Sequence, residues 1–271
     1  MVFRTEIGIK KAPWEIAYPD RIALLGSCFS DNIARKMCEF YFQVTCNPSG
    51  TLYNPISIAH HIDDVAPKAD VVIITFGTAW VYVDKATNEV VDNCQKRPAS
   101  DFIRRRLSVE DIVWLWQPIV KRYADKRFIF TVSPIRHIKD GLHENNLSKA
   151  ILHLAVEQLI QSSISNLQYS IYFPAYEIIM DELRDYRFYS DDMLHPSPMA
   201  IAYIWQRFVD AFIGSETRKE MENLHALWQK LNHRSLHPGS AEDIAFKKRT
   251  EEELRALQIR YPWLSKLSDS L

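Results

Sequence analysis

The sequence is poor in glycine, with seven in 271 residues. None of the seven belongs to a GxxxxGK[ST] or GxGxxG pattern, so the glycine-rich loops that bind nucleotide phosphates are excluded. Cysteine is also scarce. No CxxC pair occurs among the four cysteines, which are Cys28, Cys38, Cys46 and Cys94. We therefore predict neither a zinc knuckle nor a redox pair, and we expect the four thiols to be reduced.

The chain lacks long apolar runs and an excess of charge of either sign. No stretch of 18 apolar residues is present, which argues against a membrane span, and the charged first eleven residues do not resemble a signal peptide. The formal net charge of -1 gives no basic field that would favour nucleic acid. His60 and His61 are adjacent rather than one helical turn apart, which is poor metal geometry. We therefore expect a cytoplasmic protein that needs no metal or other cofactor.

Apolar runs typical of buried strands alternate with helical patterns between residues 21 and 212. This alternation predicts a mostly parallel sheet with helices on both faces. We expect a hairpin over residues 80–92. Residues 215–271 are rich in charge and predict one or two outer helices, packed on a first unit of residues 1–214. The expected strands cover residues 22–25, 42–46, 70–76, 128–132 and 169–173, and the expected helices cover 29–40, 56–64, 108–120, 146 or 148 to 163, and 198–212.

Ser27 follows the first expected strand and precedes the first expected helix. A hydroxyl at such a turn is well placed for a nucleophile, because the backbone N–H groups of the helix start point at developing negative charge. The alternative is that Ser27 serves only as the helix N-cap.

Asp192 and His195 stand three residues apart in a loop rich in proline and aspartate. A serine nucleophile needs a base and a carboxylate that orients the base. His195 and Asp192 are candidates for these two roles. The alternative is that Asp192 caps the following turn and that His195 is a surface residue.

The segment Leu25-Gly26-Ser27-Cys28-Phe29 resembles the motif that names the GSCFA family, which is similar to the SGNH (GDSL-like) hydrolase superfamily. The resemblance covers roughly residues 1–212. It continues through residues 47–55, 76–80, 91–96, 133–137, 144–149, 172–177 and 192–196.

The resemblance implies a flavodoxin-like three-layer α/β/α fold with five strands in the order 2-1-3-4-5. It also implies Ser27 as nucleophile, His195 as general base and Asp192 as the orienting carboxylate. Cys28 is then expected to be a small buried side chain.

The superfamily implies an oxyanion hole built from the N–H of the nucleophile, the N–H of a glycine after strand two, and an asparagine side chain after strand three. Ser27 and Gly50 match the first two donors. The asparagine is missing, because the chain reads Gly77-Thr78-Ala79-Trp80 where the superfamily has G-x-N-D. Thr78 or Asn93 is the expected substitute.

Further candidates surround this edge of the sheet. Arg136 and His137 are suited to a carboxylate or a sugar hydroxyl, or else belong to a structural loop. We expect the substrate-binding residues to be Asn54, Trp80, Lys96, Arg136 and His137, with Lys149 as an additional positive charge.

These observations predict a serine esterase that removes a small acyl group, for example acetyl, from a carbohydrate or a small metabolite through an acyl-enzyme. Three alternatives stay open. The same triad serves an acyltransferase if a hydroxyl acceptor replaces water. A binding module would keep the pocket without turnover. An interaction protein would act through its C-terminal helices.

Overall fold

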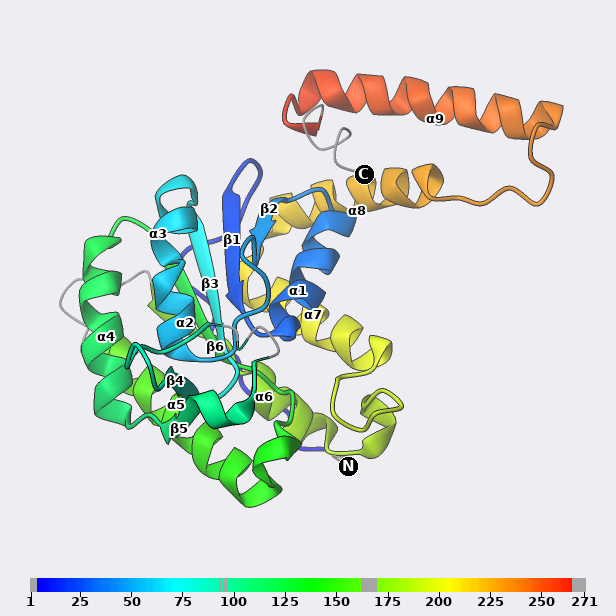
Figure 1. Ribbon diagram of the computed structural model, residues 1–271. Coiled ribbons are helices and arrows are strands. Elements are labelled where there is room, and N and C mark those ends of the chain that lie inside the picture. The colour runs from blue at the N-terminus through cyan, green and yellow to red at the C-terminus, as the bar shows by residue number, and fades with distance from the viewer. Residues whose placement is uncertain (1–3, 93, 95–96, 162–169, 265–271) are drawn as a thin grey trace.

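The computed structural model describes residues 4–92, 94, 97–161 and 170–264, and its centre is a five-stranded parallel sheet (Figure 1). The strands lie in the order β2-β1-β3-β6-β7, which confirms the predicted order 2-1-3-4-5. Their bounds are β1 Arg21–Gly26, β2 Gln43–Cys46, β3 Val71–Phe76, β6 Arg127–Val132 and β7 Ser170–Tyr172. A separate two-stranded ribbon pairs β4, Trp80–Asp84, with β5, Phe102–Arg106.

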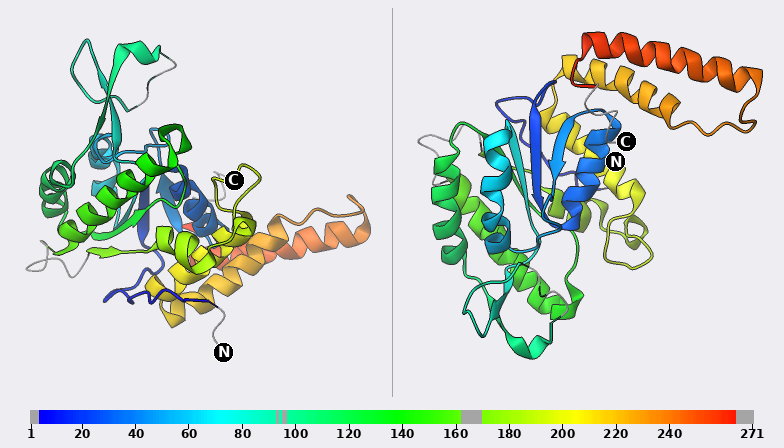
Figure 2. Two further views of the ribbon diagram at one scale, coloured as in Figure 1. Left: turned by 90° about the horizontal axis from the view of Figure 1, so that it is seen from below. Right: turned by 45° about the horizontal axis from the view of Figure 1, so that its top comes forward.

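Helices cover both faces of the sheet and make the fold a three-layer α/β/α sandwich, as predicted. One face carries α1 and α7, and the other carries α2, α4 and α5 (Figures 1 and 2). The bounds are α1 Cys28–Glu39, α2 Pro55–His60, α3 Ile62–Val65, α4 Val109–Arg122, α5 Leu142–Gln161, α6 Ala175–Glu177, a π-helix Ile178–Leu183, α7 Pro198–Phe212, α8 Ser215–Leu231 and α9 Ala241–Arg260. Short 3₁₀ turns cover Ala66–Lys68, Ala99–Asp101, Ile138–Asp140 and Tyr186–Phe188.

The central strands are apolar on both sides because each face packs against a helical layer. Alternate residues of β1 show this division. Ile22 and Leu24 join the core beneath α1 and α7, whereas Ala23 and Leu25 join the core beneath α2, α4 and α5. A continuous apolar run is therefore needed here, where a half-exposed strand would alternate with polar residues.

Several local expectations need correction. The β5 strand is absent from the prediction because Phe-Ile-Arg-Arg-Arg has no apolar periodicity. The expected hairpin over residues 80–92 is present only in short form, with the Asp84 N–H donating to Glu89 O and the Val91 N–H to Tyr82 O around a bridge between Val83 and Val90. Along its full length β4 pairs instead with β5. Helix α5 begins at Leu142, ahead of the predicted start at residue 146 or 148. No described helix combines the length and apolarity that a membrane span requires.

The carboxyl ends of the parallel strands meet at one edge of the sheet, and the β4–β5 ribbon stands out beyond that edge (Figure 2). The C-terminal helices lie at the opposite, amino edge (Figure 1). There, Leu224 of α8 and Leu264 pack against Tyr41, which precedes β2, and against Tyr18, which precedes β1. Helices α8 and α9 therefore do not close over the carboxyl edge.

Leu224→Ala is expected to lower the free energy of unfolding by about 2 to 5 kcal/mol, because Leu224 is completely buried in this small cluster. The alkylation rate of Cys28 at the carboxyl edge should change less than about twofold, since independent distant sites behave additively. Chemical denaturation and thiol labelling measure the two quantities. Leu231→Ala, at an exposed position of the same helix, is the matched control, and a similar loss in both variants would contradict this packing.

Candidate active site

Gly26 brings the end of β1 unusually close to β3. Its φ is +138°, and a Cβ at this position would lie 2.1 Å from the carbonyl oxygen of Thr75, so only glycine fits. The next N–H, that of Ser27, donates to the same Thr75 oxygen at 3.2 Å. This close approach fixes where the chain turns from β1 into α1.

Ser27 is the N-cap of α1. Its Oγ accepts a hydrogen bond from the Phe29 N–H at 3.3 Å, and the residue is completely buried. Within the described residues no hydrogen bond joins Ser27 to His195. In this structure the Ser27 hydroxyl caps the helix, and the Ser27 N–H donates to Thr75 O.

Asp192 and His195 form a tight pair in the loop before α7. The Oδ1 atom of Asp192 accepts the N–H groups of Leu194 and His195, both at 2.9 Å, and its Oδ2 lies 2.5 Å from Nδ1 of His195. The bond from the His195 N–H is the largest of the effects that lower the pKa of Asp192 to about 2. The carboxylate therefore stays ionised and fixes a proton on Nδ1 of His195, which leaves Nε2 free to act as a base.

The group that faces this base is the thiol of Cys28. Its Sγ lies 3.5 Å from Nε2 of His195, and Cys28 is the first residue of α1. Burial, followed by the charge of Asp31, raises the pKa of the Cys28 thiol. The resting side chain is thus a thiol that needs a base, and His195 stands where a base is needed. No hydrogen bond leads from the Cys28 N–H to another described residue, so this donor remains unused.

Two of the predicted oxyanion donors are engaged elsewhere. The Gly50 N–H donates to Asn47 O at 2.8 Å within an exposed turn. The Thr78 N–H donates to Tyr53 O at 2.8 Å, and its Oγ1 lies 3.1 Å from Ser148 Oγ. Both N–H groups therefore have partners within the protein in this structure. Asn93 lies outside the described residues.

Lys149 of α5 is completely buried beneath this edge. Its Nζ donates to the carbonyl oxygens of Gly77 and Ser133, both at 2.6 Å, and so connects the ends of β3 and β6. Burial lowers the pKa of Lys149 to about 7. The charge of Lys149 in turn opposes the rise in the pKa of Cys28.

His137 follows β6 and reaches the same region. Its Nε2 is buried and has no hydrogen-bond partner within the described residues. Its ring meets the ring of Tyr53 edge-on, with centroids 5.7 Å apart. Burial, then the charges of Lys149 and His195, lowers the pKa of His137 to about 3, so the imidazole is neutral at physiological pH.

Arg136, the residue before His137, lines a cavity of about 480 Å³. The guanidinium donates to the hydroxyl of Tyr189 at 2.8 Å and stacks on its ring at 4.5 Å. Tyr176 and Tyr186 also line the cavity. This combination of aromatic rings and a cation suits a polar organic group.

The other predicted substrate-binding residues are placed differently. Asn54 is the N-cap of α2, and its Oδ1 accepts the N–H groups of Ile56 and Ser57. Trp80 begins β4 and lies under the guanidinium of Arg104 at 3.9 Å. Lys96 lies outside the described residues.

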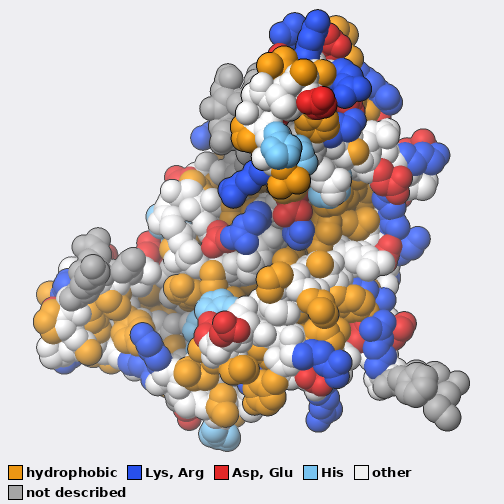
Figure 3. Space-filling model, turned by 90° about the vertical axis from the view of Figure 1, so that its right-hand side faces the viewer, with side chains coloured by type: hydrophobic (Ala, Val, Ile, Leu, Met, Phe, Trp, Pro, Cys, Tyr) orange, Lys and Arg blue, Asp and Glu red, His pale blue; other side chains and the backbone are white. Residues whose placement is uncertain are grey.

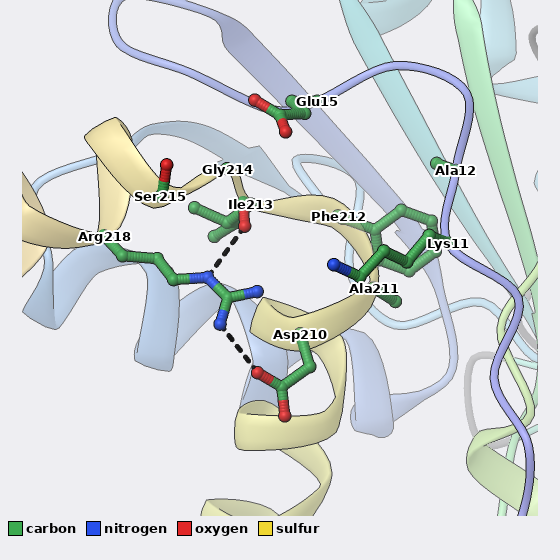
Figure 4. Close-up of a pocket in the computed structure, with 10 residues that line it drawn as sticks. All are labelled: Lys11, Ala12, Glu15, Asp210, Ala211, Phe212, Ile213, Gly214, Ser215 and Arg218. Atoms are coloured by element: carbon green, nitrogen blue, oxygen red, sulfur yellow. Dashed lines mark hydrogen bonds and ion pairs between the residues drawn. The ribbon is translucent and has the colours of Figure 1, made fainter.

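A second cavity, of about 300 Å³, lies where α7 meets α8 (Figure 4). Arg218 spans it, with hydrogen bonds to Ile213 O and Asp210 Oδ1, both at 2.8 Å.

On the face seen in Figure 3, acidic and basic side chains lie interspersed with hydrophobic ones. Among the described residues no group of three or more His, Cys, Asp or Glu side chains is arranged to hold a metal ion.

The GSCFA family pattern matches residues 21–68 and 61–208, which together span most of the chain. This chain belongs to the GSCFA family. No match was found among curated proteins.

Solved structures with a similar backbone share little sequence with this GSCFA protein. A GDSL-like lipase from Bacteroides thetaiotaomicron is 13% identical, with a TM-score of 0.43 over 75% of this chain and 88% of that one. A catalytic mutant of an acetylxylan esterase from Geobacillus stearothermophilus is 10% identical, with a TM-score of 0.47 over 73% and 95%. A lipase/acylhydrolase from Enterococcus faecalis is 14% identical, with a TM-score of 0.44 over 70% and 94%. Likenesses this weak leave the chemistry to be argued from the residues of this chain.

Lys149 is expected to make stability depend on pH. Its pKa of about 7 is below that of a free lysine, so between about pH 7 and 10 the unfolded chain binds more protons and the free energy of unfolding rises with pH. We expect about 1 to 2 kcal/mol of this rise between pH 7 and 9 to disappear in Lys149→Met. Urea unfolding at both pH values measures it, with the exposed Lys121→Met as control. The same rise in all three proteins would contradict a buried, easily deprotonated Lys149.

Proposed function

We propose that this GSCFA protein is an acyl-ester hydrolase that works through a thioester on Cys28. The observation that supports this most directly is the continuous chain of contacts from Asp192 through His195 to Cys28. The distances are 2.5 Å from carboxylate to Nδ1 and 3.5 Å from Nε2 to Sγ. This is the arrangement of nucleophile, base and orienting acid that covalent acyl transfer requires.

The reaction begins when His195 Nε2 takes the Cys28 proton and Sγ attacks the carbonyl carbon of the ester. The tetrahedral intermediate then collapses: the bond from carbon to the alcohol oxygen breaks, and the imidazolium returns the proton to that oxygen. Water next attacks the thioester as His195 accepts a proton from it. The carbon–sulfur bond breaks, the carboxylic acid leaves, and Cys28 regains its proton.

Three features of the site support a thiol nucleophile over the hydroxyl of Ser27. The thiol faces the base, whereas the hydroxyl caps α1. Cys28 is partly exposed, whereas Ser27 is completely buried. Finally, the unused N–H of Cys28 at the start of α1 is placed to meet the negative charge that forms on the substrate oxygen.

The site suits a small acyl group, such as acetyl, on a polar alcohol. Arg136 lines a cavity and directly precedes His137 in the sequence. The tyrosines and the guanidinium of this cavity offer stacking and hydrogen bonds to a sugar or a similar alcohol. The resemblance of the chain's motifs to SGNH hydrolases supports the same reaction class.

Cys28→Ala is expected to lower the hydrolysis of p-nitrophenyl acetate at least about a hundredfold, because the nucleophile is lost. Ser27→Ala should keep the rate within about fivefold and lower the free energy of unfolding by about 1 kcal/mol, the worth of an N-cap. Steady-state kinetics and urea unfolding measure both effects.

The matched control is Cys38→Ala, which removes an exposed thiol of the same helix and should leave the rate unchanged. Product that forms only when an alcohol acceptor is added would identify an acyltransferase. Full activity in Cys28→Ala together with loss in Ser27→Ala would restore Ser27 as nucleophile and contradict the thiol mechanism.

A further inference from the structure

Acyl transfer at Cys28 places a negative charge on the carbonyl oxygen of the substrate. Such sites use two or three preorganised donors for this charge. The Cys28 N–H is one unused donor. The N–H groups of Ser27, Gly50 and Thr78 are all bonded within the protein, so a second donor must come from elsewhere.

His137 presents an unpartnered nitrogen near the turn from β1 into α1. A Cβ built on Gly77 would lie 3.3 Å from Cβ of Ser27 and 3.4 Å from Nε2 of His137. The imidazole nitrogen and the residue before Cys28 therefore both lie close to Gly77. A Cβ there would also lie 2.9 Å from Tyr53 O, so glycine is what lets these segments approach one another so closely.

The surroundings of His137 hold its ring in place without occupying this nitrogen. The backbone N–H of His137 donates to Oδ1 of Asn145 at 3.0 Å, and the ring of Tyr53 packs edge-on against the imidazole. Lys149 holds both Gly77 and Ser133 by their carbonyl oxygens, which fixes the two segments that approach each other here. Nε2 itself is buried and unpartnered among the described residues.

We infer that the Nε2–H of His137 is a catalytic hydrogen-bond donor to the substrate oxyanion, acting together with the Cys28 N–H. This role rests on the proposed hydrolase function. As Sγ attacks, the electron pair of the carbonyl bond moves onto oxygen, and Nε2–H donates to that oxygen without transferring its proton. When the intermediate collapses, the electron pair returns to the carbonyl bond and the hydrogen bond weakens.

The electrostatic setting favours a neutral donor. Lys149 and His195 lie close enough for their charges to oppose a proton on His137, and burial acts in the same direction. A neutral imidazole keeps its remaining N–H over the working pH range, so it stabilises the oxyanion without competing with His195 for the proton of Cys28.

The test compares two reactions of Cys28, only one of which forms an oxyanion. Acetylation by p-nitrophenyl acetate passes through an oxyanion, whereas alkylation by iodoacetamide does not. The two variants are His137→Gln, which keeps an amide N–H donor, and His137→Met, which has similar length and no donor. We expect His137→Met to acetylate about 100- to 1,000-fold more slowly than wild type and to be alkylated within about threefold of its rate.

His137→Gln is expected to acetylate at least about tenfold faster than His137→Met. The matched control is His153→Met, which removes another partly buried imidazole whose pKa is lowered in part by Lys149. It should acetylate within about threefold of wild type.

Equal acetylation by folded His137→Gln and His137→Met would overturn the role of His137, as would an equal loss of acetylation and alkylation. Should His137→Met fail to fold, a folded His137→Gln that acetylates a hundredfold more slowly than wild type would overturn it. If wild-type Cys28 is alkylated but never acetylated, the proposed function fails, and the role of His137 fails with it. The two failures are distinguishable. The proposed function fails in the wild-type protein, whereas the role of His137 alone fails when wild type is acetylated and the His137 variants are acetylated at the same rate.

Discussion

The buried ammonium group of Lys149 is the interaction on which the active edge of the sheet depends. It donates to Gly77 O and Ser133 O, which follow two adjacent strands, β3 and β6. No carboxylate is paired with it in the described part of the chain. Its charge is met by these two carbonyl dipoles and by the ring of Tyr176, whose centroid lies 5.9 Å from Nζ. This is costly to bury and explains why its pKa falls to about 7.

The position of Lys149 has consequences for three neighbouring groups. Its charge adds to burial in lowering the pKa of His137 and partly offsets the effect of burial on the pKa of the Cys28 thiol. Its hydrogen bonds to Gly77 O and Ser133 O join the chain segments that follow β3 and β6, and the second of these leads to His137. One residue of α5 therefore supports both the nucleophile and the donor we assign to the oxyanion.

Much of the fold follows from patterns that are visible in the sequence. The apolar runs of β1, β3 and β6 predict buried strands, and Pro55 and Ser108 mark the starts of α2 and α4 as expected. The order of the strands came from the resemblance to a known superfamily. The β5 strand could not be predicted, because its arginines are accommodated by pairing with β4 and by stacking on Trp80.

The pairing of Asp192 with His195 was predictable because both belong to one short loop. The contacts that lead us to propose Cys28 in place of Ser27 could not be predicted, since neighbouring residues at a helix start point in different directions and only the backbone geometry shows which one faces His195. The partners of the Gly50 and Thr78 N–H groups were unpredictable for a related reason: whether an N–H is free depends on the turn around it. The role proposed for His137 depends on a ring nitrogen, Nε2, that has no hydrogen-bond partner among the described residues, and no sequence pattern shows this.

The central claim is that the acyl group is carried by the sulfur of Cys28. The most direct measurement is to quench the enzyme during turnover of p-nitrophenyl acetate, locate the acetyl group by fragmentation of the peptide that contains residues 27 and 28, and treat a parallel sample with neutral hydroxylamine. We expect one acetyl group on Cys28 that hydroxylamine removes, as it does from thioesters. An acetyl group on Ser27 that resists neutral hydroxylamine would contradict the account.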